Sequence, residues 1–102
     1  MSNTYQIFLI SDSTGETLDR IFLSLKAQFK NIDYKVNSYS FTRTVNQISK
    51  ILEIAEKEEN SIILYTIVDN NLAKSLANSC DKKRIPCFGV LGSLILNFSK
   101  LF

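Results

Sequence analysis

The residues most able to do chemistry lie where apolar runs give way to small polar side chains. The first such junction follows Ile7-Phe8-Leu9-Ile10 and reads Ser11-Asp12-Ser13-Thr14-Gly15. In an open α/β sheet this junction lies at the carboxyl edge of a strand, where ligands bind. The next helix would offer unpaired backbone N–H groups and the positive end of its dipole, which suits phosphate. We therefore predict phosphate binding by Ser11, Ser13, Thr14 and Gly15.

The structural alternative for this segment is an ordinary helix cap by Ser13 or Thr14, with Glu16 or Thr17 in the first turn. Asp12 fits that alternative better than the phosphate site, because a carboxylate repels phosphate unless a metal intervenes. Both interpretations stay open from the residues alone.

Two further junctions supply a cation and a carboxylate. Arg43 follows the second apolar segment, and its guanidinium offers paired donors that match phosphate. The alternative is a surface arginine that pairs with a neighbouring carboxylate. Asp69 follows the third segment and is the candidate catalytic residue, since with Asp12 it could orient a substrate hydroxyl or hold a divalent cation. Its alternative is a cap for the helix beginning at Asn70, and the pattern assigns no residue as a metal ligand.

Other chemistries are excluded by what the chain lacks. It has no His, so a Ser-His or Cys-His nucleophile cannot form within it. The two cysteines, Cys80 and Cys87, fit no zinc spacing, and we interpret both as small buried hydrophobic residues with reduced thiols. Reduced thiols indicate a cytoplasmic protein.

Composition indicates a soluble globular protein rather than a membrane or nucleic-acid protein. Hydrophobic residues make up 45% and charged residues 22% of 102 residues, which is ordinary for a soluble domain. The net charge of +2 is too small to favour nucleic acid as a partner. No segment approaches the roughly 20 apolar residues of a membrane span, and residues 1–6 do not resemble a signal peptide.

The elements that must position these residues alternate between strand and helix. Apolar runs predict strands over residues 5–10, 34–40, 62–68 and 85–91. Helical spacing predicts helices over residues 15–29, 45–58 and from about 70, and a last apolar segment over residues 94–102. This alternation predicts an α/β fold of three layers, Rossmann-like or flavodoxin-like. Its four-stranded parallel sheet has the order two-one-three-four and helices on both faces.

Apolar spacing also predicts which side chains face the core. The first helix should bury a stripe ending at Phe29, and the second should bury Val45 together with Ile48, Ile51, Leu52 and Ala55. The final segment ends on apolar side chains, including Leu101 and Phe102. We therefore expect residues 1–102 to form a single α/β domain at the amino-terminal end of a longer protein, and this segment could also pair two chains as a homodimer.

Four motifs in order resemble one family. They are Ile10-Ser11-Asp12-Ser13-Thr14-Gly15-Glu16-Thr17, Phe41-Thr42-Arg43-Thr44, Leu64-Tyr65-Thr66-Ile67-Val68-Asp69, and Ile85-Pro86-Cys87 followed by Leu91-Gly92. Together they cover nearly the whole chain. The resemblance is to the regulatory proteins of pyruvate, phosphate dikinase and phosphoenolpyruvate synthase.

The resemblance implies a bifunctional serine/threonine kinase and phosphorylase. Such a protein uses ADP to phosphorylate a threonine of the target dikinase or synthase and inactivate it. It uses phosphate to remove that group and yields pyrophosphate. The family's Gly-rich nucleotide loop, of P-loop type, is absent from this chain, whose glycines are Gly15, Gly89 and Gly92. The chain would then work beside a carboxyl-terminal kinase domain and be inactive alone. The alternative is a non-catalytic phosphate- or nucleotide-binding module, or a protein-interaction module.

Overall fold

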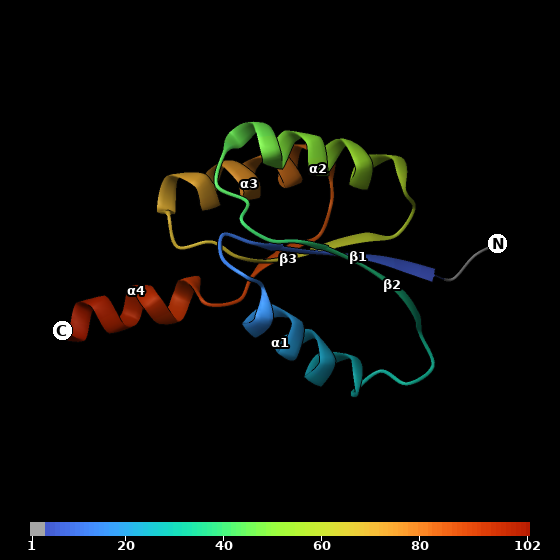
Figure 1. Ribbon diagram of the computed structural model, residues 1–102, viewed down its shortest axis with the longest axis horizontal. Helices are drawn as coiled ribbons and strands as arrows, with labels where there is room; N and C mark the ends of the chain where they lie inside the picture. The colour runs from blue at the N-terminus through green and yellow to red at the C-terminus, as the bar shows by residue number, and fades with distance from the viewer. Residues whose placement is uncertain (1–3) are drawn as a thin grey trace.

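The computed structural model describes residues 4–102 and shows a four-stranded parallel sheet in the order β2-β1-β3-β4 (Figure 1). In chain order the elements are β1 (Thr4–Ser11), α1 (Glu16–Lys26), β2 (Asp33–Tyr39), α2 (Val45–Lys57), β3 (Ser61–Thr66), α3 (Asn70–Lys83), β4 (Cys87–Gly89) and α4 (Gly92–Leu101). Helices α2 and α3 cover one face, and α1 lies on the other (Figure 1). The predicted three-layer α/β fold and strand order are confirmed.

The core has two parts because successive side chains of a strand point to opposite faces of the sheet. Phe8 and Ile10 of β1 belong to the cluster formed with α2 and α3, whereas Ile7 and Leu9 pack with Leu18 and Phe22 of α1 in the other. The cluster on the α2 and α3 side is the larger, so that layer holds most of the buried apolar surface. Both clusters meet at β1, which therefore lies at the centre of the fold.

Helix α1 ends three residues earlier than predicted. Its buried residues are Leu18 and Phe22, while Phe29 lies beyond the helix with half of its side chain exposed. The amides of Gln28 and Phe29 bond carbonyls three residues back, which tightens the last turn and stops the helix. The apolar stripe of the sequence therefore overstated the length of the buried face.

The inward orientation predicted for Val45 is also wrong, since this side chain is 55% exposed. Val45 is the first residue of α2 and precedes the part of the helix that covers the sheet. The other four predicted core residues of α2 are buried. The helix itself ends at Lys57, one residue before the predicted end.

Strand β4 is shorter than the seven residues predicted from 85 to 91. Pro86 has no N–H to donate, but its carbonyl accepts a hydrogen bond from the amide of Ile63 at 2.8 Å. At the other end the amide of Val90 donates to the carbonyl of Tyr65 at 3.0 Å, after which the chain turns into α4. The burial predicted for both cysteines holds fully for Cys80 and only in part for Cys87.

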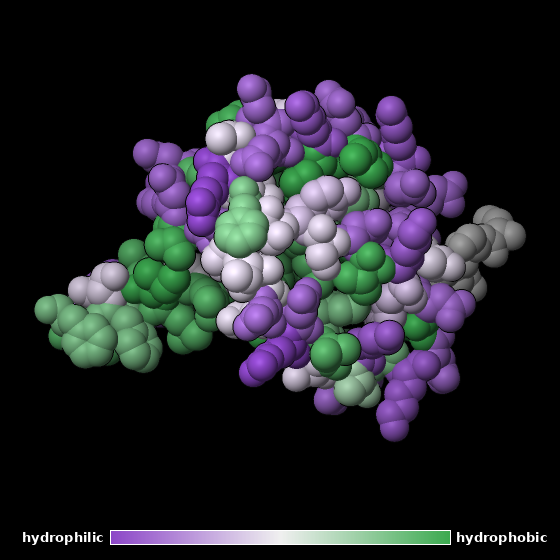
Figure 2. Space-filling model, viewed as in Figure 1, coloured by the Kyte–Doolittle hydropathy of each residue, from purple (hydrophilic) through white to green (hydrophobic). Residues whose placement is uncertain are grey.

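Helix α4 extends away from the layers and buries none of its residues (Figures 1 and 2). Figure 2 shows its apolar side chains gathered on the projecting end of the molecule. Leu94, Ile95, Phe98, Leu101 and Phe102 are all exposed. Within residues 4–102, no helix is both long and apolar enough to cross a bilayer.

Candidate phosphate-binding site

The parallel register brings the three polar junctions to one edge of the sheet. Ser11 at the end of β1 lies opposite Thr66 at the end of β3, and the amide of Asp12 donates to the carbonyl of Thr66 at 3.2 Å. The segment after β2 joins from the other side, because the amides of Phe41 and Thr42 donate to the carbonyls of Ser13 and Ser11 at 2.9 and 2.8 Å. Residues far apart in sequence thus share one backbone scaffold.

Three hydroxyl groups form a cluster behind the β1–α1 loop. The buried Ser11 Oγ accepts a hydrogen bond from the amide of Ser13 at 3.1 Å and lies 3.2 Å from Ser13 Oγ. Thr66 Oγ1 donates to the same Ser11 oxygen at 3.2 Å. Ser11 therefore organises the loop from inside, whereas Ser13 and Thr14 are exposed to solvent.

The first turn of α1 has no side-chain cap. Gly15 is the N-cap residue with φ 86°, a left-handed conformation that glycine adopts without a steric cost. The nearest hydroxyl, Thr14 Oγ1, lies 3.5 Å from the amide of Glu16, at the limit of a hydrogen bond. The predicted structural alternative, a cap by Ser13 or Thr14, is therefore wrong. The amides that begin α1 lie at the loop with the positive end of the helix dipole.

Arg43 lies beside this loop. Its Nε donates to the carbonyl of Asp12 at 3.0 Å, and its guanidinium carbon lies 5.3 Å from the centre of the Phe41 ring. Within residues 4–102 Arg43 forms no ion pair, so the alternative of a surface arginine bound to a carboxylate is not what the structure shows. The structure thus places Arg43 against Asp12, in the loop that also carries Ser13, Thr14 and Gly15.

The two carboxylates at this edge bind backbone amides. Asp12 Oδ2 accepts a hydrogen bond from the amide of Val68 at 2.8 Å and so links the β1–α1 and β3–α3 loops. Asp69 Oδ1 accepts from the amide of Leu72 at 2.9 Å and caps α3. The structural alternative for Asp69 is therefore confirmed, while its catalytic role stays a prediction. In the described part of the chain, no three acidic or cysteine side chains cluster as metal ligands would.

Sequence reasoning missed Gln47, which holds the β2–α2 junction. Its Oε1 accepts from the amides of Arg43 and Thr44 at 2.7 and 3.1 Å, and its Nε2 donates to the carbonyl of Phe41 at 3.2 Å. Thr44 Oγ1 in turn accepts a hydrogen bond from the amide of Gln47 and so caps α2. The spacing Thr44-x-x-Gln47 is the sequence signal of a capping box and could have revealed this residue.

The shifted pKa values lie on the β3 and β4 side of the edge. Burial raises the pKa of Tyr65, with smaller contributions from the thiols of Cys87 and Cys80. Cys87 donates a hydrogen bond to Cys80 and is partly buried, and both effects raise the pKa of the Cys87 thiol. The hydroxyl of Tyr65 and the thiol of Cys87 therefore stay neutral at physiological pH. Tyr65 is partly buried and packs against the core cluster on the α2 and α3 side of the sheet.

The hollows of the surface differ in what they could hold. The enclosed space beside Gly15 and Ser38 is only about 40 Å³, so an anion at this loop would lie on the open surface. A cleft of about 790 Å³ lies between α3 and α4, with Asn70 and Lys74 on one wall and Ile95 on the other. The carboxyl edge thus carries a small hollow at the β1–α1 loop and a larger cleft between α3 and α4.

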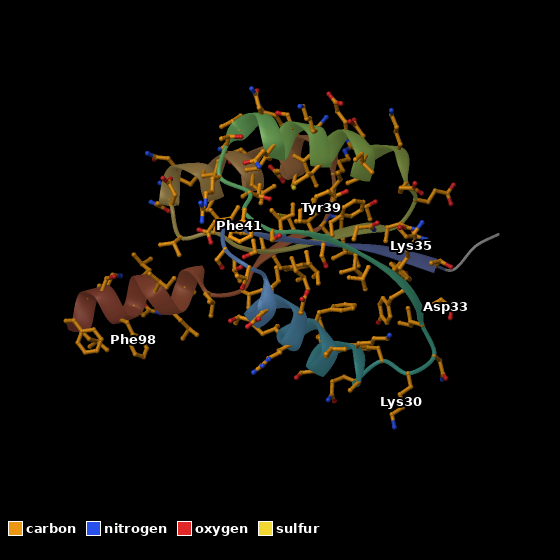
Figure 3. All side chains as sticks on the ribbon, viewed as in Figure 1. Lys30, Asp33, Lys35, Tyr39, Phe41 and Phe98 are labelled. Carbon is orange, nitrogen blue, oxygen red and sulfur yellow. The ribbon has the colours of Figure 1, made fainter. Side chains whose placement is uncertain are left out.

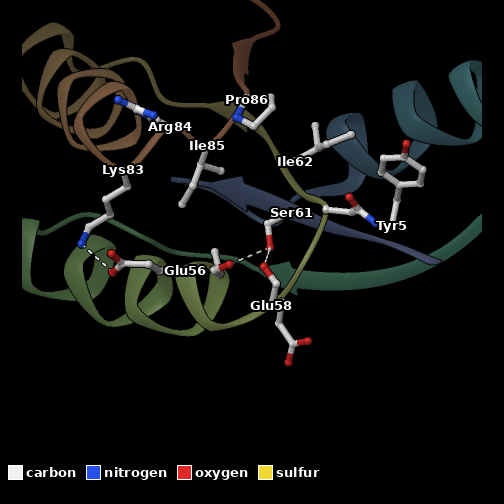
Figure 4. Close-up of a pocket in the computed structure, with 11 residues that line it drawn as sticks. Tyr5, Glu56, Glu58, Ser61, Ile62, Lys83, Arg84, Ile85 and Pro86 are labelled. Carbon is white, nitrogen blue, oxygen red and sulfur yellow. Dashed lines mark hydrogen bonds and ion pairs between the residues drawn. The ribbon is translucent and has the colours of Figure 1, made fainter. Parts of the chain in front are cut away.

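The hollow at the amino edge is formed by residues already engaged in structural contacts (Figure 4). It has a volume of about 390 Å³ and contains the Lys83–Glu56 ion pair at 2.8 Å. Ser61 Oγ donates to the carbonyl of Ala55 at 2.7 Å. None of the predicted site residues lines it, so it is not the candidate site.

Comparison with known proteins identifies the family. A sequence model of the family described as kinase/pyrophosphorylase matches residues 7–102. A relative from Pelagibacter ubique is 73% identical over 101 residues, which cover 99% of this chain and 37% of the relative. A relative from Geotalea uraniireducens is 36% identical over 96 residues, covering 94% of this chain and 35% of the relative.

A third relative, from Ehrlichia chaffeensis, is 34% identical over 98 residues, which cover 96% of this chain and 36% of the relative. All three carry the provisional name pyruvate, phosphate dikinase regulatory protein. This chain spans about a third of the length of these relatives. Because the family match extends over nearly all of its residues, the chain belongs to the kinase/pyrophosphorylase family.

Proposed function

We propose that this chain is the amino-terminal, phosphate-binding part of a cytoplasmic kinase and phosphorylase that regulates pyruvate, phosphate dikinase or phosphoenolpyruvate synthase. In the kinase direction ADP supplies the phosphoryl group for a threonine of the target. In the reverse direction inorganic phosphate removes that group as pyrophosphate. The names of the relatives favour the dikinase as the target.

The observation that supports this proposal best is the position of Arg43. Its guanidinium is bound through Nε to the carbonyl of Asp12, in the β1–α1 loop that leads into the uncapped first turn of α1. A helix N-terminus and a guanidinium both favour phosphate, and they act against the negative charges of Asp12, Glu16 and Asp19 near this loop. The hydroxyls of Ser13 and Thr14 can add hydrogen bonds from the same loop.

In this proposal, the bound phosphate is the nucleophile of the reverse reaction. One of its oxygens attacks the phosphorus of the target phosphothreonine, the bond from phosphorus to the threonine oxygen breaks, and that oxygen takes up a proton. Asp69 lies at the same edge, where one of its carboxylate oxygens accepts a hydrogen bond from the amide of Leu72. The other carboxylate oxygen of Asp69 could orient the threonine hydroxyl, or pass that proton to and from the threonine oxygen.

The test uses a chimera in which this chain replaces the matching part of the Pelagibacter ubique relative. Incubation with ADP and a pyruvate, phosphate dikinase should produce a phosphothreonine detectable by mass spectrometry, and added phosphate should remove it with release of pyrophosphate. The 102-residue chain alone should do neither. Absence of both reactions in a folded chimera would overturn the proposed enzyme function.

A matched pair of variants tests the site itself. Arg43→Asn should slow the phosphate-dependent reaction because it removes the proposed anion ligand. Arg84→Asn removes a guanidinium from the amino edge, at a residue whose φ of 57° asparagine also tolerates. This control should retain full activity.

A protein-interaction module is the second candidate, favoured by the exposed apolar side chains of α4 (Figure 2). Large exposed apolar patches often mark sites of association. If the chimera binds the dikinase but transfers no phosphoryl group, the interaction module replaces the enzyme as the function of this chain.

A further inference from the structure

Phe41 has a backbone conformation that its side chain disfavours. Its φ is 53°, in the left-handed region that bulky residues avoid. Within residues 4–102, the two other non-glycine residues with a positive φ have ordinary reasons for it, because Asn60 is of a tolerant type and Arg84 forms the C-cap of α3. Burial does not explain Phe41, since 51% of its side chain is exposed. A strained residue of this kind at a candidate site indicates a functional constraint.

Hydrogen bonds on both sides hold Phe41 in this conformation. Its amide donates to the carbonyl of Ser13 at 2.9 Å, and its own carbonyl accepts from Gln47 Nε2 at 3.2 Å. The next amide, of Thr42, donates to the carbonyl of Ser11 at 2.8 Å. Figure 3 shows Phe41 at the opposite end of β2 from Asp33 and Lys35. The ring is therefore fixed at the carboxyl edge, next to the β1–α1 loop.

The ring forms one of two contacts that fix the guanidinium of Arg43. The guanidinium carbon lies 5.3 Å from the ring centre, within range of a cation–π interaction, and Nε donates to the carbonyl of Asp12 at 3.0 Å. The terminal Nη groups make no hydrogen bond within residues 4–102. The arginine is thus oriented before a ligand arrives, while its paired donors stay available.

We propose that Phe41 is a positioning residue for phosphate, which holds Arg43 in place against its ring at the edge of the β1–α1 loop. This inference rests on the proposed function, in which Arg43 binds phosphate. Phe41 does not touch the anion, and its effect passes entirely through Arg43. A leucine at this position would keep the strained backbone but lose the ring face.

The test is a double-mutant cycle on the 102-residue chain, with inorganic phosphate as the titrant in calorimetry. Phe41→Leu should weaken phosphate binding about two- to five-fold, the value expected for an exposed cation–π contact. Phe41→Trp should retain the affinity. In an Arg43→Asn background, Phe41→Leu should have no further effect, because the residue it orients is gone.

The matched control is Phe29→Leu, which makes the same change at a side chain of equal exposure in the α1–β2 connection. It should leave phosphate affinity unchanged. In the chimera, Phe41→Leu should raise the KM for phosphate and leave the kcat with ADP unaltered, whereas a merely structural defect would lower both activities together.

The possible results distinguish a wrong role for Phe41 from a wrong role for Arg43. If Arg43→Asn weakens binding but Phe41→Leu does not, the positioning role is wrong and the phosphate site stands. If Phe41→Leu weakens binding equally in both backgrounds, Phe41 acts independently of Arg43 and the inference is overturned. If the unsubstituted chain binds no phosphate, or Arg43→Asn binds it normally, the proposed role of Arg43 fails and the inference fails with it.

Discussion

Replacing Gln47 tests whether one exposed side chain holds the whole β2–α2 junction. Gln47→Ala removes the acceptor of the Arg43 amide, the Thr44 amide and the Thr44 hydroxyl, and the donor to the carbonyl of Phe41. It keeps the cap that Thr44 Oγ1 forms on the amide of residue 47. Each lost bond contributes about 0.5–1.5 kcal/mol net. The freed groups are exposed and can bind water, and alanine favours the helix by a few tenths of a kcal/mol. We expect the free energy of unfolding to fall by about 1–2 kcal/mol.

The assay is thermal and urea unfolding followed by circular dichroism. For a domain of this size, each kcal/mol should lower the Tm by about 4–8 °C. The matched control is Gln28→Ala, in the exposed turn after α1, because the side chain of Gln28 makes no hydrogen bond within residues 4–102. An equal loss of stability in the two variants would refute the role assigned to Gln47.

A second variant separates the acceptor from the donor of this side chain. Gln47→Glu keeps an oxygen for the Arg43 and Thr44 amides and adds a negative charge in the first turn of α2, which is favourable by about 0.3–1 kcal/mol. It loses only the bond to Phe41. Stability should therefore stay within about 0.5 kcal/mol of the unsubstituted chain, while phosphate binding should weaken because the new charge repels the anion. Stronger phosphate binding would contradict the proposed position of the anion.

Three further outcomes follow from other contacts. Gly89→Ala should lower the free energy of unfolding by about 1–3 kcal/mol, because a Cβ there would lie 2.8 Å from Cζ and from the hydroxyl oxygen of Tyr65. In a Tyr65→Leu background, urea unfolding should show that Gly89→Ala loses only a small part of that free energy. Cys87 should react with iodoacetamide at pH 8 at least about ten-fold more slowly in the native chain than in urea, because its raised pKa lowers the thiolate fraction. Equal rates in the native chain and in urea would show that the fold neither shields the Cys87 thiol nor raises its pKa. Leu101→Glu together with Phe102→Glu should increase the monomer fraction in sedimentation, since both side chains are exposed on α4. A fully monomeric unsubstituted chain would mean that α4 drives no association.

The order of the strands was predictable because it depends on features that a sequence displays directly. Apolar runs such as residues 62–68 mark strands buried on both faces, and right-handed crossovers then restrict their order. The ends were harder to predict. Pro86 and Val90 still hydrogen-bond β3 on either side of Cys87–Gly89, so the ends of β4 depend on partners that the local sequence does not show. Phe29 continued an apolar stripe that the fold does not bury.

The candidate site was predictable only as a set of neighbours. The carboxyl-edge rule brought Ser13, Arg43 and Asp69 to one edge without any knowledge of their contacts. It could not tell that Asp69 caps α3, because the same residue type suits a cap and a catalytic base. The left-handed backbone of Phe41 was also invisible, since phenylalanine gives no signal for that conformation.

The hydroxyl cluster behind the β1–α1 loop fixes the direction in which the Ser13 hydroxyl can point its proton. Ser11 Oγ has two lone pairs, and the hydroxyl of Thr66 and the amide of Ser13 occupy both of them. The proton of Ser11 is then left for the contact with Ser13 Oγ, so Ser13 accepts there. The exposed Ser13 hydroxyl therefore keeps its own proton free to point outward from the loop. A threonine at the end of β3 thus sets the polarity of a hydroxyl on the β1–α1 loop through one shared oxygen.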